Sequence, residues 1–233
     1  MERVDKILSD SGVGSRKDIK KLIAVGRVAV NGVICRDGAD KVERENTIIL
    51  CDNVRINTSR YRYFVMNKPS GVITATEDKS KKTVLDLLSD SDRRLGLFPV
   101  GRLDKDTTGL LLLTNDGDFA HKIISPGCHV NKCYIAHTDG TPDENAVRAF
   151  ASGLVLSDGT ECQTALLEII DSGVCAVTIH EGKYHQVKRM LAAVGCPVLE
   201  LNRISVGGFK LGSELPKGAY RELSEEERKL IFI

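Results

Sequence analysis

The chain lacks the features that mark a secreted or membrane-spanning protein. Its 233 residues contain no apolar run long enough to cross a bilayer. Its first residues, Met1-Glu2-Arg3-Val4-Asp5, are charged where a secretion signal would be apolar. The seven cysteines are odd in number, and no two are spaced as Cys-x-x-Cys. We therefore expect a cytoplasmic protein with small, buried, reduced thiols rather than a disulfide framework.

Signatures of cofactor and metal binding are missing as well. The sequence has no glycine-rich dinucleotide or phosphate loop. Cys128, His129, Cys133 and His137 lie close together, but their spacing fits no common zinc pattern. Lys+Arg (33) and Asp+Glu (32) nearly cancel to a net charge of +1, so only the distribution of charge can indicate a nucleic-acid partner. We expect neither a metal nor a small-molecule cofactor.

Residues 1–57 are predicted to form a small unit of their own. A helix is expected over about 3–9, and a second begins at Ser15, where Asp18 completes a capping-box pattern. Asn31-Gly32 between apolar pairs is a strong hairpin signal. Short strands are predicted over 27–30, 33–34 and 47–50.

Basic side chains gather on the second of these helices, against a single acid, Asp18. They can be an ordinary solvated helix face. They can also be a surface that reads an RNA backbone, because each phosphate that a cation neutralises releases counterions. The cluster consists of Arg16, Lys17, Lys20 and Lys21, with Arg27 just beyond it.

After a polar connector, residues 62–233 are predicted to form one larger α+β domain. Strands and helices do not alternate as a regular βαβ series, which favours a mixed, mostly antiparallel sheet. Thr141 is expected to cap a helix, with Pro142 in its first turn, and Ser224 with Glu227 to cap the last one. The remaining expected helices are 83–88, 117–124 and 187–194, and the expected strands are 63–67, 97–100, 110–114, 130–138, 165–170 and 174–180.

The most informative stretch is a polar octet, 102–109, between two apolar strands. A polar loop held between buried strands is a good platform for a reactive group. An isolated Asp-x-Asp-Thr-Thr-Gly is nevertheless more often a turn whose side chains cap backbone amides. The residues of the octet alone leave both interpretations open.

Gly101-Arg102-Leu103-Asp104, followed by Thr108-Gly109-Leu110-Leu111 and Thr114-Asn115-Asp116-Gly117, resembles the signature of the RsuA/RluB branch of the pseudouridine synthases. The likeness continues in the family's order over nearly the whole chain. Residues 1–57 resemble the αL RNA-binding motif of ribosomal and RNA-modifying proteins. Other matching stretches are the opening strand (63–71), the Lys-x-Tyr motif (132–134), the third motif (182–190) and the strand after it (203–208).

The resemblance implies an enzyme that isomerises uridine to pseudouridine in RNA with no cofactor. It places the essential aspartate at Asp104 and suggests that Tyr134 stacks on the target base and assists proton removal at carbon 5. A charged carboxylate kept from water needs a cationic neighbour. Lys188 is the expected one, and Arg189 is the alternative.

The same resemblance suggests how RNA is held. Arg102 would fill the space that the base vacates or contact a phosphate, and His185 and Gln186 would orient the third motif or touch RNA. A tethered basic unit would raise the effective concentration of RNA at the site. The expected RNA surface of the N-terminal unit is Arg3, Arg16, Lys17, Lys20, Lys21 and Arg27.

The run 185–190 and the short C-terminus are most similar to the RsuA type, which acts on small-subunit rRNA. We therefore predict a monomeric rRNA pseudouridine synthase, with rRNA or an assembling ribosomal particle as its partner. Three alternatives remain: a large-subunit rRNA synthase, a non-catalytic assembly factor, and a hydrolase that uses Asp104 with a second carboxylate such as Asp106.

Overall fold

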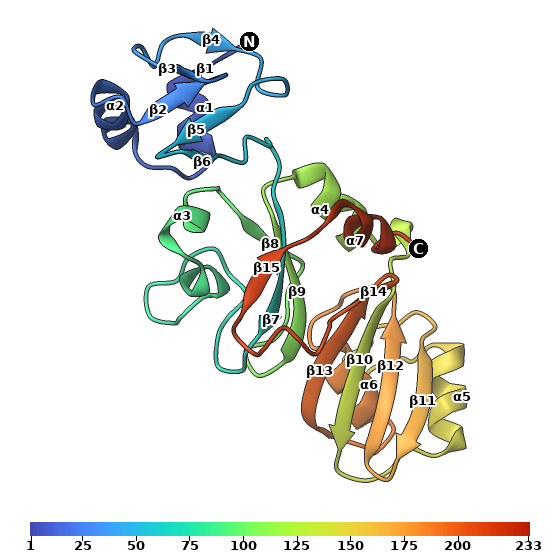
Figure 1. The fold of residues 1–233 in the computed structure, drawn as a ribbon. Helices are drawn as coiled ribbons and strands as arrows, with labels where there is room; N and C mark the ends of the chain where they lie inside the picture. The colour runs from blue at the N-terminus through green and yellow to red at the C-terminus, as the bar shows by residue number, and fades with distance from the viewer. The chain divides into compact units, whose positions relative to one another are not determined.

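A computed structural model describes residues 1–125 and 127–233 in full and residue 126 by its backbone alone. The chain divides into two compact units (Figure 1). The N-terminal unit comprises Met1–Arg62 together with Leu88–Leu97, and the larger unit comprises Tyr63–Leu87 together with Phe98–Ile233. The predicted boundary between residues 57 and 62 did not anticipate that residues 88–97 belong to the first unit. None of the described helices is long and apolar enough to cross a membrane.

The N-terminal unit packs two short helices against small antiparallel sheets. The predicted capping box is present, because the Ser15 hydroxyl accepts from the amide of Asp18 while the Asp18 carboxylate accepts from the amide of Ser15. Asn31 and Gly32 both have positive φ, as a tight hairpin turn requires. The core includes Ile7, Leu8 and Ile19, which are fully buried. The elements are β1 (Glu2–Arg3), α1 (Val4–Asp10), α2 (Arg16–Ala24), β2 (Val28–Val30), β3 (Val33–Ile34), β4 (Lys41–Val42), β5 (Ile49–Cys51), β6 (Val54–Arg55) and α3 (Asp90–Arg93).

The larger unit is built on a nine-stranded sheet with the order β11-β12-β10-β13-β9-β7-β15, in which β14 pairs with β13 and β8 with β9. The pairing of β13 with β9 is parallel and the others are antiparallel, so the predicted α+β class with a mostly antiparallel sheet is confirmed. The strands are β7 (Tyr63–Lys68), β8 (Phe98–Val100), β9 (Thr108–Thr114), β10 (Lys132–Thr138), β11 (Leu166–Asp171), β12 (Val174–Ile179), β13 (Val198–Val206), β14 (Phe209–Lys210) and β15 (Tyr220–Glu222).

The helices of this unit follow the sequence patterns with two exceptions. The prediction that Thr141 caps a helix is wrong: Asp143 is the cap and accepts from the amide of Ala146 at 2.8 Å. The Thr141 hydroxyl instead accepts from the amide of Gly173 in the β11–β12 turn. The predicted helix 83–88 is a single 3-10 turn, η1 (Val84–Leu87). The others are α4 (Gly117–Ile124), η2 (Pro126–Cys128), α5 (Glu144–Ser152), α6 (Gln186–Ala193) and α7 (Glu225–Leu230), and the capping box at Ser224 is confirmed.

Strand β9 is the rigid centre of this unit. Leu110, Leu111, Leu112 and Leu113 are all at most 1% exposed, because the strand is covered on both faces. The polar octet therefore leads directly into a buried strand.

All seven cysteines of the chain, each among the described residues, are free, and five of them are buried.

The parallel pairing of β9 with β13 joins two halves of the sheet where the octet ends. Gly109 lies opposite Arg203 and has φ +100°, a conformation that L side chains rarely adopt. A Cβ at Gly109 would overlap with the carbonyl oxygen of Arg203 and the amide oxygen of Asn202. Glycine is therefore required for the two strands to meet.

We expect Gly109→Ala to lower the free energy of unfolding by roughly 3 kcal/mol or more, because it adds both strain and overlap. Gly117→Ala is the matched control. It lies at the first position of α4 with nothing within 4 Å of its Cβ, so we expect no loss of stability. Thermal unfolding of the two variants is the measurement, and equal midpoints would contradict the role assigned to Gly109.

Candidate active site

The octet opens into a cavity of about 690 Å³ in the larger unit. Its walls come from the loop after β8, from β9, β10 and β13, and from the start of α6, elements that Figure 1 shows close together. The lining combines titratable side chains with apolar ones such as Leu112, Ile179 and Val206. The titratable side chains on which the site depends are Asp104, Lys132, Tyr134, His185, Lys188 and Arg203.

A buried lysine holds the loop that carries Asp104. Lys68, at the end of β7, is 0% exposed, and its ammonium donates to the carbonyl oxygens of Asp104 at 3.0 Å, Lys105 at 3.2 Å and Thr107 at 2.9 Å. It also donates to Pro69 at 3.1 Å. Burial lowers the pKa of Lys68 to about 8, against the opposing effect of the charges of Asp106 and Asp104. The ammonium is therefore protonated at neutral pH, and its three N–H groups are shared among the four carbonyl oxygens.

This role was not predicted, because a lysine beside Pro69 at a strand end is normally exposed. Its only signal was its place in the stretch that resembles the family's opening strand. The burial becomes visible only when β7 is paired with β9, in which Lys68 lies opposite Gly109.

Asp104 has two basic neighbours, both from the start of α6. The Nε2 of His185 is 3.4 Å from Oδ1, and the Nζ of Lys188 is 3.8 Å from Oδ2. Lys188 also lies 2.5 Å from Asp106, and that hydrogen bond lowers the pKa of the Asp106 carboxyl. The side chain of Asp104 is 28% exposed, so its carboxylate is only partly solvated and benefits from the neighbouring cation.

Arg189, the alternative partner of Asp104, faces elsewhere. Its guanidinium is 2.5 Å from Asp158 and donates to the carbonyl oxygen of Tyr184 at 3.4 Å. Adjacent residues of a helix point about 100° apart, so Lys188 and Arg189 cannot both face one carboxylate. The structure brings Lys188 to Asp104 and does not bring Arg189 there.

Tyr134 lies on β10 and forms part of the cavity wall. It is 7% exposed and shares the buried face of the strand with Lys132 and Ala136. Its hydroxyl is 3.4 Å from Nη1 of Arg203, and the Arg203 Cζ is 5.9 Å from the centre of its ring. Arg203 in turn donates from Nε to the carbonyl oxygen of Leu110 at 2.8 Å, which fixes the guanidinium between β9 and β10.

Lys132, like Arg203, is a buried cation that lines this cavity. It is 8% exposed and donates to the carbonyl oxygen of Val130 at 2.8 Å. Burial, and then the charge of Arg203, lower the pKa of Lys132 to about 8. Lys132 and Arg203 were predicted only as members of motifs. The available signal was a lysine two positions from a tyrosine on one predicted strand, and therefore on the same face of it.

The turn before α6 presents aromatic rings to the cavity. His185 has φ +49°, and its ring stacks on that of Tyr184 at 3.9 Å. Tyr184 is 69% exposed and was not predicted as a site residue. Gln186, predicted to orient the third motif or to contact RNA, is 3% exposed. Its side-chain Nε2 donates to Glu181 at 2.6 Å, and its Oε1 accepts from the backbone amide of Lys183 at 2.9 Å. This side chain is therefore placed to hold the turn in shape rather than to touch RNA.

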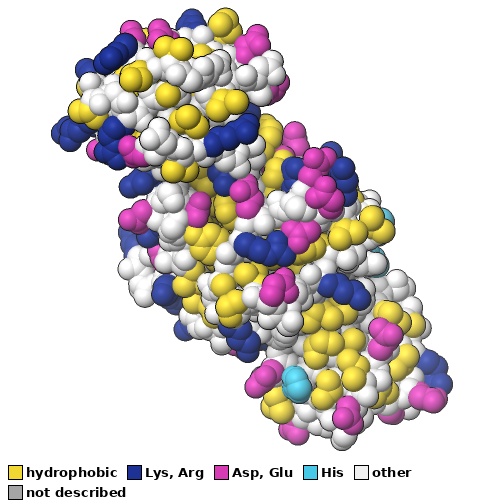
Figure 2. Space-filling model, in the orientation of Figure 1, with side chains coloured by type: hydrophobic (Ala, Val, Ile, Leu, Met, Phe, Trp, Pro, Cys, Tyr) yellow, Lys and Arg dark blue, Asp and Glu magenta, His cyan; other side chains and the backbone are white. Residues whose placement is uncertain are grey.

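The predicted RNA surface of the N-terminal unit divides into two groups. Arg16, Lys17, Lys20 and Lys21 are exposed on α2, around which Figure 2 shows basic side chains gathering. Arg3 and Arg27 form two-pronged ion pairs with Asp5 and Asp52, so their charge is largely compensated. Arg102, in the larger unit, is exposed and lines the cavity of Asp104.

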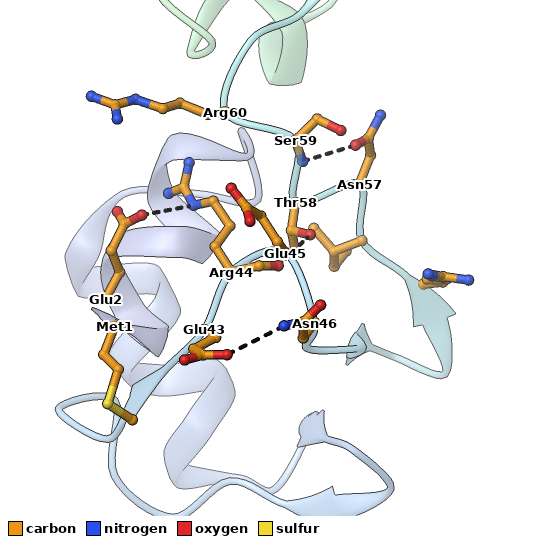
Figure 3. Close-up of a pocket in the computed structure, with 12 residues that line it drawn as sticks. Met1, Glu2, Glu43, Arg44, Glu45, Asn46, Asn57, Thr58, Ser59 and Arg60 are labelled. Atoms are coloured by element: carbon orange, nitrogen blue, oxygen red, sulfur yellow. Dashed lines mark hydrogen bonds and ion pairs between the residues drawn. The ribbon is translucent and has the colours of Figure 1, made fainter.

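A second hollow, of about 940 Å³, lies within the N-terminal unit (Figure 3). Its central side chain is Arg44, 9% exposed and ion-paired with Glu2 at 3.4 Å and Asp10 at 2.7 Å. The carbonyl oxygen of Arg44 accepts from the hydroxyl of Thr58. The bond from Thr58 attaches the connector to the unit, and the two ion pairs hold Arg44 in place.

Comparison with known proteins agrees with this geometry. The family model described as RNA pseudouridylate synthase matches residues 62–193, and that of the S4 domain matches residues 2–48. The chain is 42% identical to a Bacillus subtilis protein described as an uncharacterized RNA pseudouridine synthase, over 98% of both chains. It is 39% identical to the ribosomal small subunit pseudouridine synthase A of Escherichia coli, over 97% of both chains. A crystal structure of a pseudouridylate synthase matches with a TM-score of 0.70 and 33% identity, over 99% of this chain and 100% of that one.

We expect Lys68→Met to loosen the octet, because four carbonyl oxygens lose their buried donor. The free energy of unfolding should fall by roughly 3 kcal/mol, and amide hydrogen exchange over residues 104–107 should accelerate. Lys122→Met, on the exposed side of α4, is the matched control and should change neither quantity. Unchanged exchange at 104–107 in Lys68→Met would refute the tethering role.

Proposed function

This chain belongs to the RNA pseudouridylate synthase family, and we propose that it converts one uridine of small-subunit rRNA into pseudouridine. The observation that carries the proposal is the meeting of Asp104, Lys188 and Tyr134 at one cavity, with the Asp104 loop held by Lys68. The name of the Escherichia coli relative and the likeness over the full length support the choice of substrate.

The reaction needs a carboxylate and a dry pocket, and nothing has to be oxidised or reduced. The bond between the ribose carbon 1′ and N1 of uracil breaks, carbon 1′ joins carbon 5, the proton of carbon 5 leaves, and N1 gains a proton. Asp104 attacks the ribose or the base, or removes a proton that promotes cleavage. In each case the ammonium of Lys188, 3.8 Å from Oδ2, lies beside the carboxylate that acts on the substrate.

The target base has to leave its stack in folded RNA before it can reach Asp104. Stacking on Tyr134, at the wall of the cavity, offsets part of that cost of a few kcal/mol. Arg102, exposed at the same cavity, occupies the gap in the RNA or contacts a phosphate. Tyr184 and His185 form a stacked pair to which a neighbouring base can add.

The S4 domain holds the RNA element that carries the target. Its four exposed cations on α2 give a backbone contact with little sequence preference. The partner is rRNA, either free or in an assembling particle, and a monomer suffices because the site is built from one chain. A substrate of this kind places the enzyme in the cytoplasm.

Asp104 should be essential for the reaction. The native protein should release tritium from small-subunit rRNA labelled at carbon 5 of uracil, and Asp104→Asn should reduce the rate by at least about a thousandfold, because the amide is neither base nor nucleophile. Release from large-subunit rRNA alone would make that rRNA the substrate in place of small-subunit rRNA. No release from either rRNA, free or in partly assembled particles, would favour a non-catalytic assembly factor.

Replacing the two cations of α6, Lys188 and Arg189, should have different effects on kcat. Lys188→Met leaves Asp104 without its ammonium partner and should lower kcat by roughly a hundredfold, whereas Lys188→Arg should retain most of it. Arg189→Met removes only the ion pair with Asp158 and should keep kcat within about threefold. The opposite order of the two losses would make Arg189 the partner of Asp104.

A further inference from the structure

Lys132 and Arg203 are two cations buried side by side without an acid. They project from neighbouring strands into the cavity of Asp104 and are 8% and 4% exposed. In the described part of the chain their recorded partners are the carbonyl oxygens of Val130 and Leu110 and the hydroxyl of Tyr134. Neither takes part in an ion pair, unlike Lys188, which lines the same cavity and pairs with Asp106.

Such an arrangement costs free energy in the empty protein. A buried charge is stable only when it is paired or well hydrogen-bonded, and two like charges in a medium of low dielectric repel. Burial lowers the pKa of Lys132, and the charge of Arg203 lowers it further. Two carbonyl oxygens and a phenol compensate this only in part, so the pair is suited to an anionic ligand.

The depth of the pair identifies which part of the RNA can supply that anion. A phosphate stays on the backbone of the RNA, at the mouth of the cavity, where the exposed Lys81, Arg102 and Lys183 lie. A flipped base is flat and largely apolar, which suits a cavity that Leu112, Ile179 and Val206 line together with the buried cations. The group that meets Lys132 and Arg203 is therefore the pyrimidine ring.

Uracil becomes anionic during the reaction. When the bond from carbon 1′ to N1 breaks, its electron pair stays on N1 and spreads to the two carbonyl oxygens of the ring. Attack at the ring by Asp104 would likewise place charge on a carbonyl oxygen. Charge that develops only in the transition state is stabilised best by cations already fixed in place in a site without water.

We propose that Lys132 and Arg203 form an anion subsite that binds the carbonyl oxygens of uracil and stabilises the charge the ring gains as its bond to ribose breaks. The inference rests on the proposed function for its substrate. Arg203 is fixed by Leu110 and Tyr134, so Lys132 is the residue whose removal tests the subsite with least disturbance of the fold.

The first measurement uses the free base and needs no RNA. 5-Nitrouracil ionises in the weakly acidic range and changes its absorbance when it does so. Bound to the native protein it should ionise at a pH lower by about one unit, a tenfold preference for the anion. Lys132→Met should abolish most of that shift, and Lys210→Met, an exposed lysine of β14, should not. An unshifted titration with saturating native protein would overturn the subsite.

The second measurement uses steady-state tritium release from rRNA. Lys132→Met should lower kcat roughly a hundredfold while KM for the RNA changes less than about threefold, because phosphate contacts supply the affinity. Lys132→Arg should restore much of the rate. The melting temperature of Lys132→Met should not fall, since replacing a buried unpaired cation by an apolar chain is neutral or stabilising.

A kcat of Lys132→Met within about threefold of native, in a folded protein, would overturn the subsite and leave the isomerase intact. An inactive native protein whose 5-nitrouracil titration is shifted would instead remove the proposed substrate and retain the subsite. The two failures are thereby distinguished.

Discussion

The active site depends on one ammonium group in the interior. Lys68 binds three carbonyl oxygens of the octet, and so determines where the backbone of Asp104 lies relative to β7. A loop of aspartates, threonines and a glycine has little packing of its own, and each ordered residue costs roughly 1–2 kcal/mol of conformational entropy. The lysine makes that ordering possible, because an ammonium can satisfy several acceptors from one point.

Charge is arranged asymmetrically around the cavity. On the α6 side, Lys188 lies beside two carboxylates, that of Asp106 at 2.5 Å and that of Asp104 at 3.8 Å. On the sheet side, Lys132 and Arg203 are matched by carbonyl oxygens and a phenol. The cavity between the two sides is also lined by apolar side chains, so the dielectric there is low. The difference in potential therefore acts strongly on a uracil ring that enters.

Local features of the fold were predictable and contacts distant in sequence were not. The capping boxes at Ser15 and Ser224 and the Asn31-Gly32 turn each depend on neighbouring residues, and all three are present. The sequence could not separate Lys188 from Arg189, because their directions depend on how α6 packs. The burial of Lys68 and Lys132 likewise follows from strand pairings that no local pattern specifies. Asp143 caps its helix in place of Thr141, whose hydroxyl is bonded to Gly173, 32 residues away.

The junction of β9 with β13 also governs when the site can form. Arg203 bonds to Leu110 across 93 residues of sequence, and closure of so long a loop is slow compared with the pairing of a hairpin. On a ribosome, β7, β8 and β9 emerge well before β13, so Asp104 is synthesised long before the wall that carries Arg203. The chain therefore acquires its reactive pocket as a late folding event, and a truncated product would carry the aspartate without the enclosure.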